Sequence, residues 1–361
     1  MFRTRVYTTT PSLNSIRLKM KRKRTPVLAF FGIMGVLILL LFVLDIMLGS
    51  VNIPFKDFWG IIIGDEAVSN VSRQILIHFR LPKVITAILA GSALAVSGLQ
   101  MQTIFRNPLA GPYVLGISSG ASLGVAIAVL GSSAIGLGFW FGQIGVVLAA
   151  LIGSMLILLL IVAVSIRIRD IMTILILGII FGMATSAITS ILQYFSSEGS
   201  LKTYVIWTMG SLSSVNGSQL WLFSGLVIIG QILAIALSRP LNVLSLGENY
   251  ARSLGYNVEK IRLIVFVSTS LLAGTTTAFA GPIAFIGIAV PHIVRLILHT
   301  SNHAILIPST LVTGASIMML CDVIAQLPGS NLVLPINSVA ALMGIPVVVY
   351  VILSKKRFAQ H

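Results

Sequence analysis

Residues 27–48 read VLAFFGIMGVLILLLFVLDIML, a run in which Asp45 is the single charged residue. An α-helix needs about 20 apolar residues to cross the hydrocarbon core of a bilayer, which is about 30 Å thick. The run shows no alternation of polar and apolar residues, so it indicates a transmembrane helix and not a strand of a membrane barrel. It follows a basic segment at residues 19–24 without a convincing small-residue cleavage site, which favours a retained first span over a signal peptide.

Similar apolar runs recur along the whole chain. Of its 361 residues, 57% are hydrophobic and 9% are charged, whereas soluble domains carry about 25% charged residues. This composition excludes a water-soluble globular domain. The predicted spans are 27–48, 71–104, 114–130, 138–165, 170–193, 217–238, 261–280, 283–298, 303–327 and 332–353. The second is too long for one perpendicular crossing, so we expect its first turns to tilt or to stand outside the membrane.

Lys and Arg residues fall mainly in every second gap between these runs. One side collects 19 of the 24, at residues 3–24, 106, 167–169, 239–262, 295 and 355–357. The other side holds Lys56, Arg73, Arg80, Lys83 and Lys202. Because cytoplasmic loops collect Lys and Arg, this pattern predicts an even number of spans, about ten, with both chain ends in the cytoplasm. It also explains the net charge of +15 without nucleic-acid binding.

The predicted fold class is therefore an all-α integral membrane protein with one domain. We expect a basic cytoplasmic tail at residues 1–26, a transmembrane domain at residues 27–354 and a second cytoplasmic tail at residues 355–361. Small residues crowd one side of the second span: Ala87, Ala90, Gly91, Ala93, Ala95 and Gly98. Such residues allow helix backbones to approach closely, and they could also line a wide, uncharged path.

Two Ala-Gly-Pro tripeptides precede the two short spans. They lie at residues 110–112 and 280–282, and the charge pattern places the first on the cytoplasmic side and the second outside. Broken or short segments at matching places in two halves are typical of an inverted repeat. Coincidence explains the match equally well, because Gly and Pro are common in membrane helices.

The longest polar interruption in the second half, residues 239–262, contains LGENYARSLG at residues 246–255. We expect two short helices broken at Gly255, which is a suitable helix stop with Arg252 in the turn before it. The segment could be a solvated connector. Alternatively, Leu246, Tyr250, Ala251 and Leu254 would form an apolar face that a partner must cover.

The chain lacks sequence signatures of its own chemistry. No G-x-x-x-x-G-K-[ST] phosphate loop and no H-E-x-x-H motif occurs, and Cys321 is the single cysteine. We therefore expect no catalytic residue, metal or cofactor in this chain and an energy source elsewhere.

Two alternatives start from polar residues in the apolar runs. Asp322 could be the coupling carboxylate of an ion-coupled secondary transporter, or it could pair structurally with backbone or a neighbouring polar group. His292, His299 and His303 could form a metal or haem site of a membrane enzyme. They could equally be ordinary polar residues at the membrane boundary.

A series of short motifs occurs in order over nearly the whole chain after residue 27. These are Arg80-Leu81-Pro82-Lys83, Arg106-Asn107-Pro108-Leu109-Ala110, Leu115-Gly116-Ile117-Ser118-Ser119-Gly120-Ala121, Trp207-Thr208-Met209-Gly210-Ser211, Ser238-Arg239-Pro240-Leu241-Asn242, Leu246-Gly247-Glu248, Ala280-Gly281-Pro282-Ile283-Ala284-Phe285-Ile286-Gly287, Pro291-His292-Ile293-Val294-Arg295-Leu296, Leu334-Pro335-Ile336-Asn337 and Gly344-Ile345-Pro346. Together they resemble the FecCD-type permease family of ABC importers for iron-siderophores, haem and cobalamin.

The resemblance implies a type II ABC importer permease fold with ten helices in a bacterial inner membrane. It implies four kinds of partner: a second permease subunit, expected as a homodimer, two ATP-binding cassette subunits that bind ATP and Mg, an extracytoplasmic substrate-binding protein, and the lipid bilayer. Such a permease moves its substrate inward by alternating access. The cargo that the resemblance implies is an iron chelate, haem or cobalamin.

The resemblance also implies roles for individual residues. Arg80 and Lys83 would dock the binding protein, although Lys83 stands where many members have arginine, so the bidentate geometry is lost. Asn107 and Leu109 match one cytoplasmic gate region, and Ile171 and Met172 correspond more weakly to another. The ATPase-coupling loop would contain Leu246, Gly247, Glu248, Ala251, Arg252, Leu254 and Gly255. A third basic docking contact is absent from residues 328–331.

Overall fold

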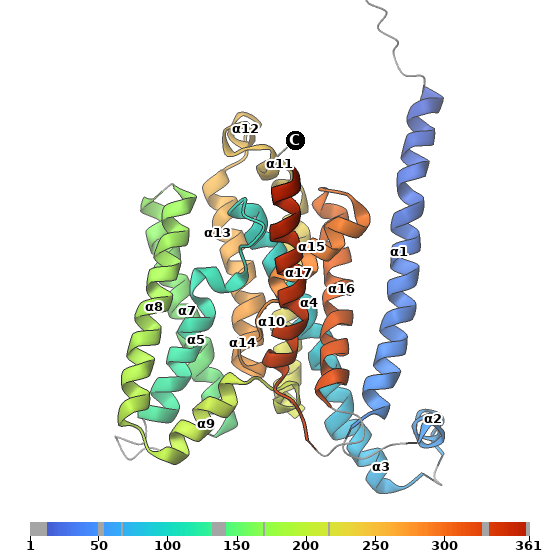
Figure 1. Ribbon diagram of the computed structural model, residues 1–361, viewed down its shortest axis with the longest axis vertical. Helices are drawn as coiled ribbons and strands as arrows, with labels where there is room; N and C mark the ends of the chain where they lie inside the picture. Colours follow the sequence, from blue (N-terminus) through green and yellow to red (C-terminus); the bar gives the residue numbers. More distant parts are fainter. Residues whose placement is uncertain are drawn as a thin grey trace, which may run out of the picture.

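The computed structural model describes residues 13–49, 54–65, 68–131, 142–168, 170–215, 217–326 and 332–358, and within these ranges every regular element is a helix. The helices form one bundle of roughly parallel and antiparallel rods (Figure 1). Residues 1–12 and 359–361 of the predicted tails lie outside the described residues, and the rest of each tail continues a helix, α1 from Leu13 and α17 to Phe358. The all-helical membrane fold expected from the sequence is confirmed.

Among the described residues, eight helical stretches are long and apolar enough to cross a membrane. They are α1 (Leu13–Met47), α3 (Asn70–Ile75) with α4 (Leu81–Ile104), α7 (Gln143–Arg167), α8 (Ile171–Phe195), α10 (Gly217–Ala236), α13 (Val258–Thr269) with α14 (Thr275–Ala280), α16 (His303–Ala325) and α17 (Ile336–Phe358). Two shorter apolar helices are α5 (Ile117–Ala126) and α15 (Ile286–Leu298). Each of the ten predicted spans overlaps one of these stretches.

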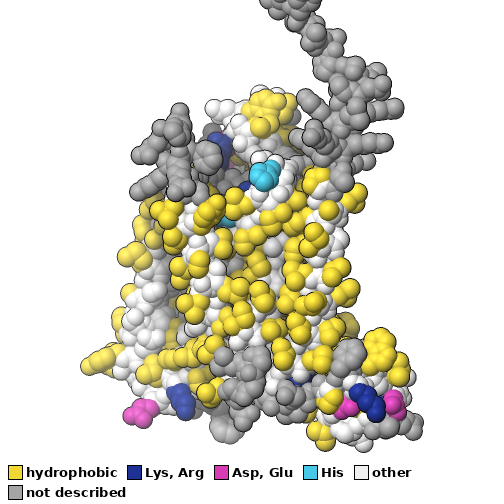
Figure 2. Space-filling view, turned by 45° about the vertical axis from the view of Figure 1, so that its right-hand side comes forward, with side chains coloured by type: hydrophobic (Ala, Val, Ile, Leu, Met, Phe, Trp, Pro, Cys, Tyr) yellow, Lys and Arg dark blue, Asp and Glu magenta, His cyan; other side chains and the backbone are white. Residues whose placement is uncertain are grey.

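Four short helices mark the two ends of the bundle. α2 (Phe55–Ile63) and α9 (Glu198–Thr208) lie at one end, together with α3, and α11 (Ser238–Leu246) and α12 (Glu248–Ser253) lie at the other (Figure 1). We call these the α9 end and the α12 end. The two groups of cations separated in the sequence thus lie at opposite ends. Figure 2 shows hydrophobic side chains over the flank between them, as a lipid-facing surface requires.

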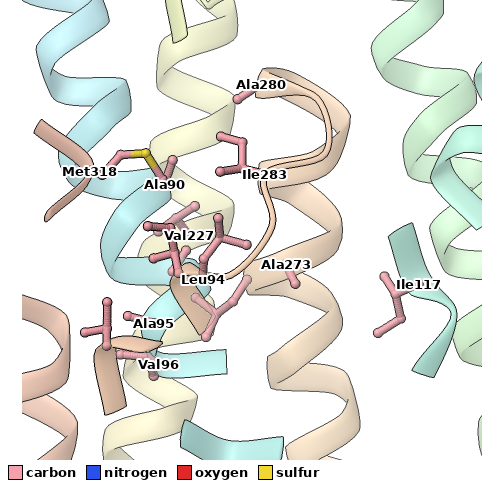
Figure 3. Packing of buried hydrophobic residues seen from close by; sticks show 14 of the residues in the cluster. Ala90, Leu94, Ala95, Val96, Ile117, Val227, Ala273, Ala280, Ile283 and Met318 are labelled. Atoms are coloured by element: carbon pink, nitrogen blue, oxygen red, sulfur yellow. The ribbon is translucent and has the colours of Figure 1, made fainter. Parts of the chain in front are cut away.

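Helix α4 is the centre of the bundle and packs against α10, α15 and α16. Its glycines lie at the crossings: Gly91 meets the backbone of Gly314 on α16, and Gly98 meets the backbone of Gly287 on α15. Figure 3 shows Ala90 and Leu94 of α4 in the same packed interior. Small residues are needed here because two helix backbones come into contact, which confirms the packing interpretation of this span.

The segments that follow the two Ala-Gly-Pro tripeptides come into contact inside the bundle. The first tripeptide follows the turn at Asn107, at the α12 end, and Gly281 of the second lies against Trp207 at the end of α9, so their placement on opposite sides of the membrane stays a prediction. The Tyr113 hydroxyl, just after the first tripeptide, donates a hydrogen bond to the Ile283 carbonyl just after the second. Pro112 lies against Gly287. The charge pattern could not reveal this contact, because it reports on loops in water, whereas both tripeptides lie largely buried at interruptions between helices.

Polar groups from other elements satisfy the backbone around the second break. The Ser211 N–H donates to the Ala280 carbonyl at 2.8 Å, and the Ser214 hydroxyl donates to the Phe279 carbonyl at 2.9 Å. The Asn337 side-chain oxygen accepts a hydrogen bond from the Ala284 N–H at 3.0 Å. Such partners are required where a helix is interrupted inside an apolar bundle.

We predict that Gly98→Ala destabilises the fold. The added methyl group would overlap the Gly287 carbonyl oxygen, and overpacking of this kind costs about 1–3 kcal/mol or more. Gly225 of α10 has open space around it, so Gly225→Ala should be neutral or slightly stabilising through its helix propensity. Thermal unfolding of the two purified variants in detergent checks this. Equal melting temperatures would contradict the proposed close contact.

Candidate functional site

The loop at the α12 end is built on two glycines with positive φ. Gly247, at φ 139°, separates α11 from α12, and Gly255, at φ 82°, lies just after α12. The Tyr256 N–H donates to the Ala251 carbonyl at 3.0 Å, which closes the helix end. The expected helix stop at Gly255, with Arg252 in the last turn, is confirmed, but the break between the two short helices α11 and α12 lies at Gly247 and not at Gly255. Glycine adopts both conformations without a Cβ penalty.

Three large apolar side chains project from this loop. Leu246 is 71% exposed, Tyr250 49% and Leu254 52%. Ala251, which we expected on the same face, is completely buried in the core. We call Leu246, Tyr250 and Leu254 the apolar tip. An exposed apolar cluster beyond the ends of the long helices is unfavourable in water unless something covers it.

Ion pairs hold the polar side of the loop against α13. Arg262, which is almost fully buried, binds Glu248 at 2.8 Å, and Arg252 binds Glu259 at 2.6 Å. The Arg252–Glu259 pair is exposed and contributes little stability, whereas the Glu248–Arg262 pair anchors the start of α12. Glu248 and Arg252 thus orient the loop, and the apolar tip is left facing outward.

His303 connects α11 to the interior of the bundle. The Asn242 side-chain oxygen on α11 accepts hydrogen bonds from the His303 N–H at 2.7 Å and from its Nδ1 at 2.8 Å. The His303 Nε2 lies 2.8 Å from the Thr103 hydroxyl near the end of α4. Movement of α11 must therefore strain or break contacts with α4 and α16. Sequence reasoning missed this role, because no spacing pattern links Asn242 to His303.

The histidines do not form the metal site considered from the sequence. His303 is held by Asn242 and Thr103, and the His292 Nε2 lies 2.8 Å from the Pro108 carbonyl. His299 is exposed at the end of α15. Within the described ranges, no three His, Cys, Asp or Glu side chains are grouped to hold a metal ion.

The predicted gate residues lie at the α12 end in two separate turns. After α4, the Asn107 side-chain oxygen accepts a hydrogen bond from the Leu109 N–H at 3.0 Å, and Leu109 is exposed. Neighbouring Arg106 donates to the Leu244 carbonyl of α11 at 3.3 Å, which joins this turn to the helix before Gly247. No hydrogen bond among the described residues joins it to the second turn, at Ile171 and Met172.

The second turn is the start of α8. Ile171 packs against the core and Met172 is half-exposed. Asp170 caps the helix by accepting hydrogen bonds from the Thr173 N–H at 2.9 Å and the Met172 N–H at 3.3 Å. The Thr173 hydroxyl and these N–H groups lower the pKa of the Asp170 carboxyl, so the cap is ionised at neutral pH.

A hydroxyl-lined groove runs along α5, α8 and α9. One part has a volume of about 360 Å³, and an adjoining hollow of about 470 Å³ shares Ser119 and Ser186 with it. No charged side chain lines either part. The polar lining consists of Ser118, Ser119, Ser122, Ser186, Thr189, Ser190, Gln193, Tyr204 and Tyr113. Only the fold places the hydroxyl groups of α8 beside those of α5, because no spacing pattern links the two helices.

Arg80 and Lys83 lie near the α9 end in a polar cluster and not on an open surface. Arg80 is 8% exposed and donates to the Ile46 carbonyl, and the Lys83 Nζ lies 2.7 Å from the Asp322 carboxylate. Gln326 donates to the carboxylate oxygens of Asp45 at 2.5 Å and Asp322 at 3.3 Å. This cluster joins α1, α4 and α16, and it favours the structural interpretation of Asp322.

Both basic residues also line a pocket of about 340 Å³ beside His78, Phe79 and Ser213. Their cationic groups are thus held near an opening at the α9 end. The structure shows this position, while their role in docking stays a prediction.

We predict that Lys83→Met lowers the melting temperature in detergent, because it leaves the Asp322 carboxylate buried without its cation. Breaking a buried pair in this way costs about 3–5 kcal/mol in soluble proteins. The double variant Lys83→Met/Asp322→Asn should recover part of the loss. Lys56→Met, which removes an exposed cation, is the control. A double variant less stable than Lys83→Met alone would contradict the pairing.

The arrangement matches known transport proteins. The FecCD transport family matches residues 37–354. The vitamin B12 import system permease protein BtuC of Klebsiella pneumoniae subsp. pneumoniae is 36% identical over 291 residues, covering 81% of this chain and 86% of that protein. The protein of the same name from Salmonella paratyphi A is 37% identical over 280 residues, covering 78% and 84%.

A solved structure, an inward-facing conformation of a metal-chelate type ABC transporter, superposes with a TM-score of 0.79 at 29% identity. The match covers 90% of this chain and 99% of that one. The chain therefore belongs to the FecCD transport family and is the transmembrane subunit of an ABC importer.

Proposed function

We propose that this subunit carries a metal chelate, an iron-siderophore, haem or cobalamin, across a bacterial inner membrane into the cytoplasm. The observation that carries the proposal is the uncharged, hydroxyl-lined groove on α5, α8 and α9. A chelator surrounds its metal and presents amide, hydroxyl and carboxylate groups outward. The hydroxyl groups of the groove can form hydrogen bonds with these outward groups one after another as the cargo moves. Each neutral hydrogen bond is weaker than a bond to a charged side chain, so the cargo is not held at one point. The names of the relatives support the same cargo class.

We further propose that two separate ATP-binding cassette subunits bind ATP and Mg and drive transport through the α11–α12 loop. Support comes from the apolar tip, which is held outward by the Glu248–Arg262 pair. Arg106 and the Asn242–His303–Thr103 contacts would pass movement of α11 to the turn at Asn107 and Leu109. In this scheme Ile171 and Met172 would contribute to the same gate.

On the outer side we propose that Arg80 and Lys83 receive acidic side chains of a substrate-binding protein. The pocket that both residues line at the α9 end supports this. Lys83 would have to exchange Asp322 for the new carboxylate, so docking and the polar cluster would be linked. A second copy of this chain would complete the membrane part of the transporter.

We expect ATP-dependent accumulation of one chelate when the permease is reconstituted in liposomes with its ATPase and binding protein. Ferric siderophore, haem and cobalamin are compared in parallel, with and without ATP. An assembled complex that hydrolyses ATP and accumulates none of the three would contradict the cargo class. Uptake that follows an ion gradient without ATP would instead favour coupling through Asp322.

We predict that Leu254→Asp weakens binding of the ATPase subunit by about tenfold or more, because it places a charge in an apolar contact. Copurification and uptake should fall together, while the melting temperature of the permease stays unchanged. Asn249→Asp adds the same charge to an exposed position of α12 and is the matched control. Normal association of the Leu254→Asp variant would show that the apolar tip is not the contact.

A further inference from the structure

A second polar pocket, of about 300 Å³, lies at the α12 end between the end of α4 and helices α11, α15 and α16. It shares no residue with the hydroxyl-lined groove or the apolar tip. Its polar lining includes Arg106, Arg295, Thr103, Ser245, Ser301 and His303. We call it the two-arginine pocket. No step of the proposed transport cycle uses it as a binding site.

Both arginines of the pocket lack an acidic partner within the described part of the chain. The ion pairs there are Lys83–Asp322, Arg252–Glu259 and Arg262–Glu248. Arg295 donates to the Gln102 side-chain oxygen at 2.5 Å, and Arg106 donates to the Leu244 carbonyl at 3.3 Å. A guanidinium group carries five N–H donors, so most donors of both groups are left for a ligand.

The two guanidinium groups are held in place before any ligand binds. Gln102, which accepts from Arg295, donates through its Nε2 to the Ile288 carbonyl at 3.1 Å, so its orientation is set. Arg106 lies in a strained turn with φ 46° and is tied to α11. Arg295 is partly buried and Arg106 is exposed, and both line one hollow. Two like charges beside one hollow attract an anion, and fixed arginine forks suit the oxygens of a phosphate.

The surroundings favour a phosphate at a membrane boundary. Leu306 forms one wall of the pocket, and Leu296 and Ile297, next to Arg295 in α15, are about half exposed. A polar hollow bordered by apolar surface suits a phosphate group whose remaining part lies among lipid chains. Ser301 and the start of α16, a helix of 23 residues, add a hydroxyl and a favourable helix end.

We propose that the two-arginine pocket binds a phosphate group, either the headgroup phosphate of an anionic phospholipid or free inorganic phosphate. Such a ligand would join Arg106, in the turn after α4, to Arg295 on α15, beside Ser245 of α11. The bound phosphate would therefore connect the turn at Asn107 and Leu109 to α11 and α15. The proposal concerns this chain alone and does not depend on the identity of the cargo.

The test uses the full-length protein, purified and freed of lipid in detergent. Native mass spectrometry counts bound short-chain phosphatidylglycerol against zwitterionic phosphatidylcholine, and calorimetry measures binding of inorganic phosphate. Arg106→Gln and Arg295→Gln should each lower the affinity for the probe that binds by about tenfold or more. Arg106→Lys keeps the positive charge but loses the paired N–H donors of the guanidinium group, so its affinity should lie between those of the unaltered protein and of Arg106→Gln. Arg239→Gln, an exposed cation of α11 outside the pocket, should change nothing.

Each outcome decides the proposal. Selective phosphatidylglycerol binding that both pocket variants lose supports a lipid phosphate, and saturable binding of inorganic phosphate lost in the same variants supports the free ion. Equal losses in Arg239→Gln would show general charge attraction and overturn the site. If neither probe binds while Arg106→Gln loses only the ATPase subunit, the pocket takes a protein carboxylate and the proposal is wrong. Because the Arg106 side chain is exposed and Arg295 is only partly buried, the Arg106 variants keep the test valid if Arg295→Gln does not fold.

Discussion

The rest of the structure depends on the close approach of α4 to α15 and α16. Gly98 and Gly287 meet at one crossing, and Gly91 and Gly314 meet at another, about two turns away along nearly the same face of α4. Inside a bilayer no hydrophobic effect draws helices together, so packing and hydrogen bonds between close backbones must do so. With its small side chains at these crossings, α4 can lie in the middle of the bundle. Both polar clusters that join α4 to other helices rely on that position.

The broken helices are a second constraint. The tripeptides that precede α5 and α15 are buried, and their backbone groups cannot be left to water. Ser211, Ser214 and Asn337 supply hydrogen bonds around the second break. The motifs at residues 207–211, 280–287 and 334–337, which are far apart in the sequence, therefore come together in the fold, where two of them satisfy the interrupted backbone of the third. The groove along α5 depends on this arrangement, because α5 begins only after its break.

Polar contacts at the two ends differ in kind. At the α9 end, Lys83 and Asp322 neutralise each other in a buried cluster that fastens α1 to α4 and α16. At the α12 end, cations outnumber their acidic partners among the described residues, and Arg106 and Arg295 converge without one. The first arrangement holds helices together. The second leaves positive charge available at the end where the coupling loop and the predicted gates meet.

The sequence by itself determined the helical membrane class, the positions of the apolar helices and the two-sided distribution of charge, because each depends on local composition and on transfer between water and lipid. It also located the polar segment that forms the α11–α12 loop, with Leu246, Tyr250 and Leu254 on it. It could not show the break at Gly247, the burial of Ala251, the meeting of Tyr113 with Ile283 or the pairing of Lys83 with Asp322. Those contacts join residues by helix packing, which has no periodic signature along the chain, so only the tertiary structure decided them.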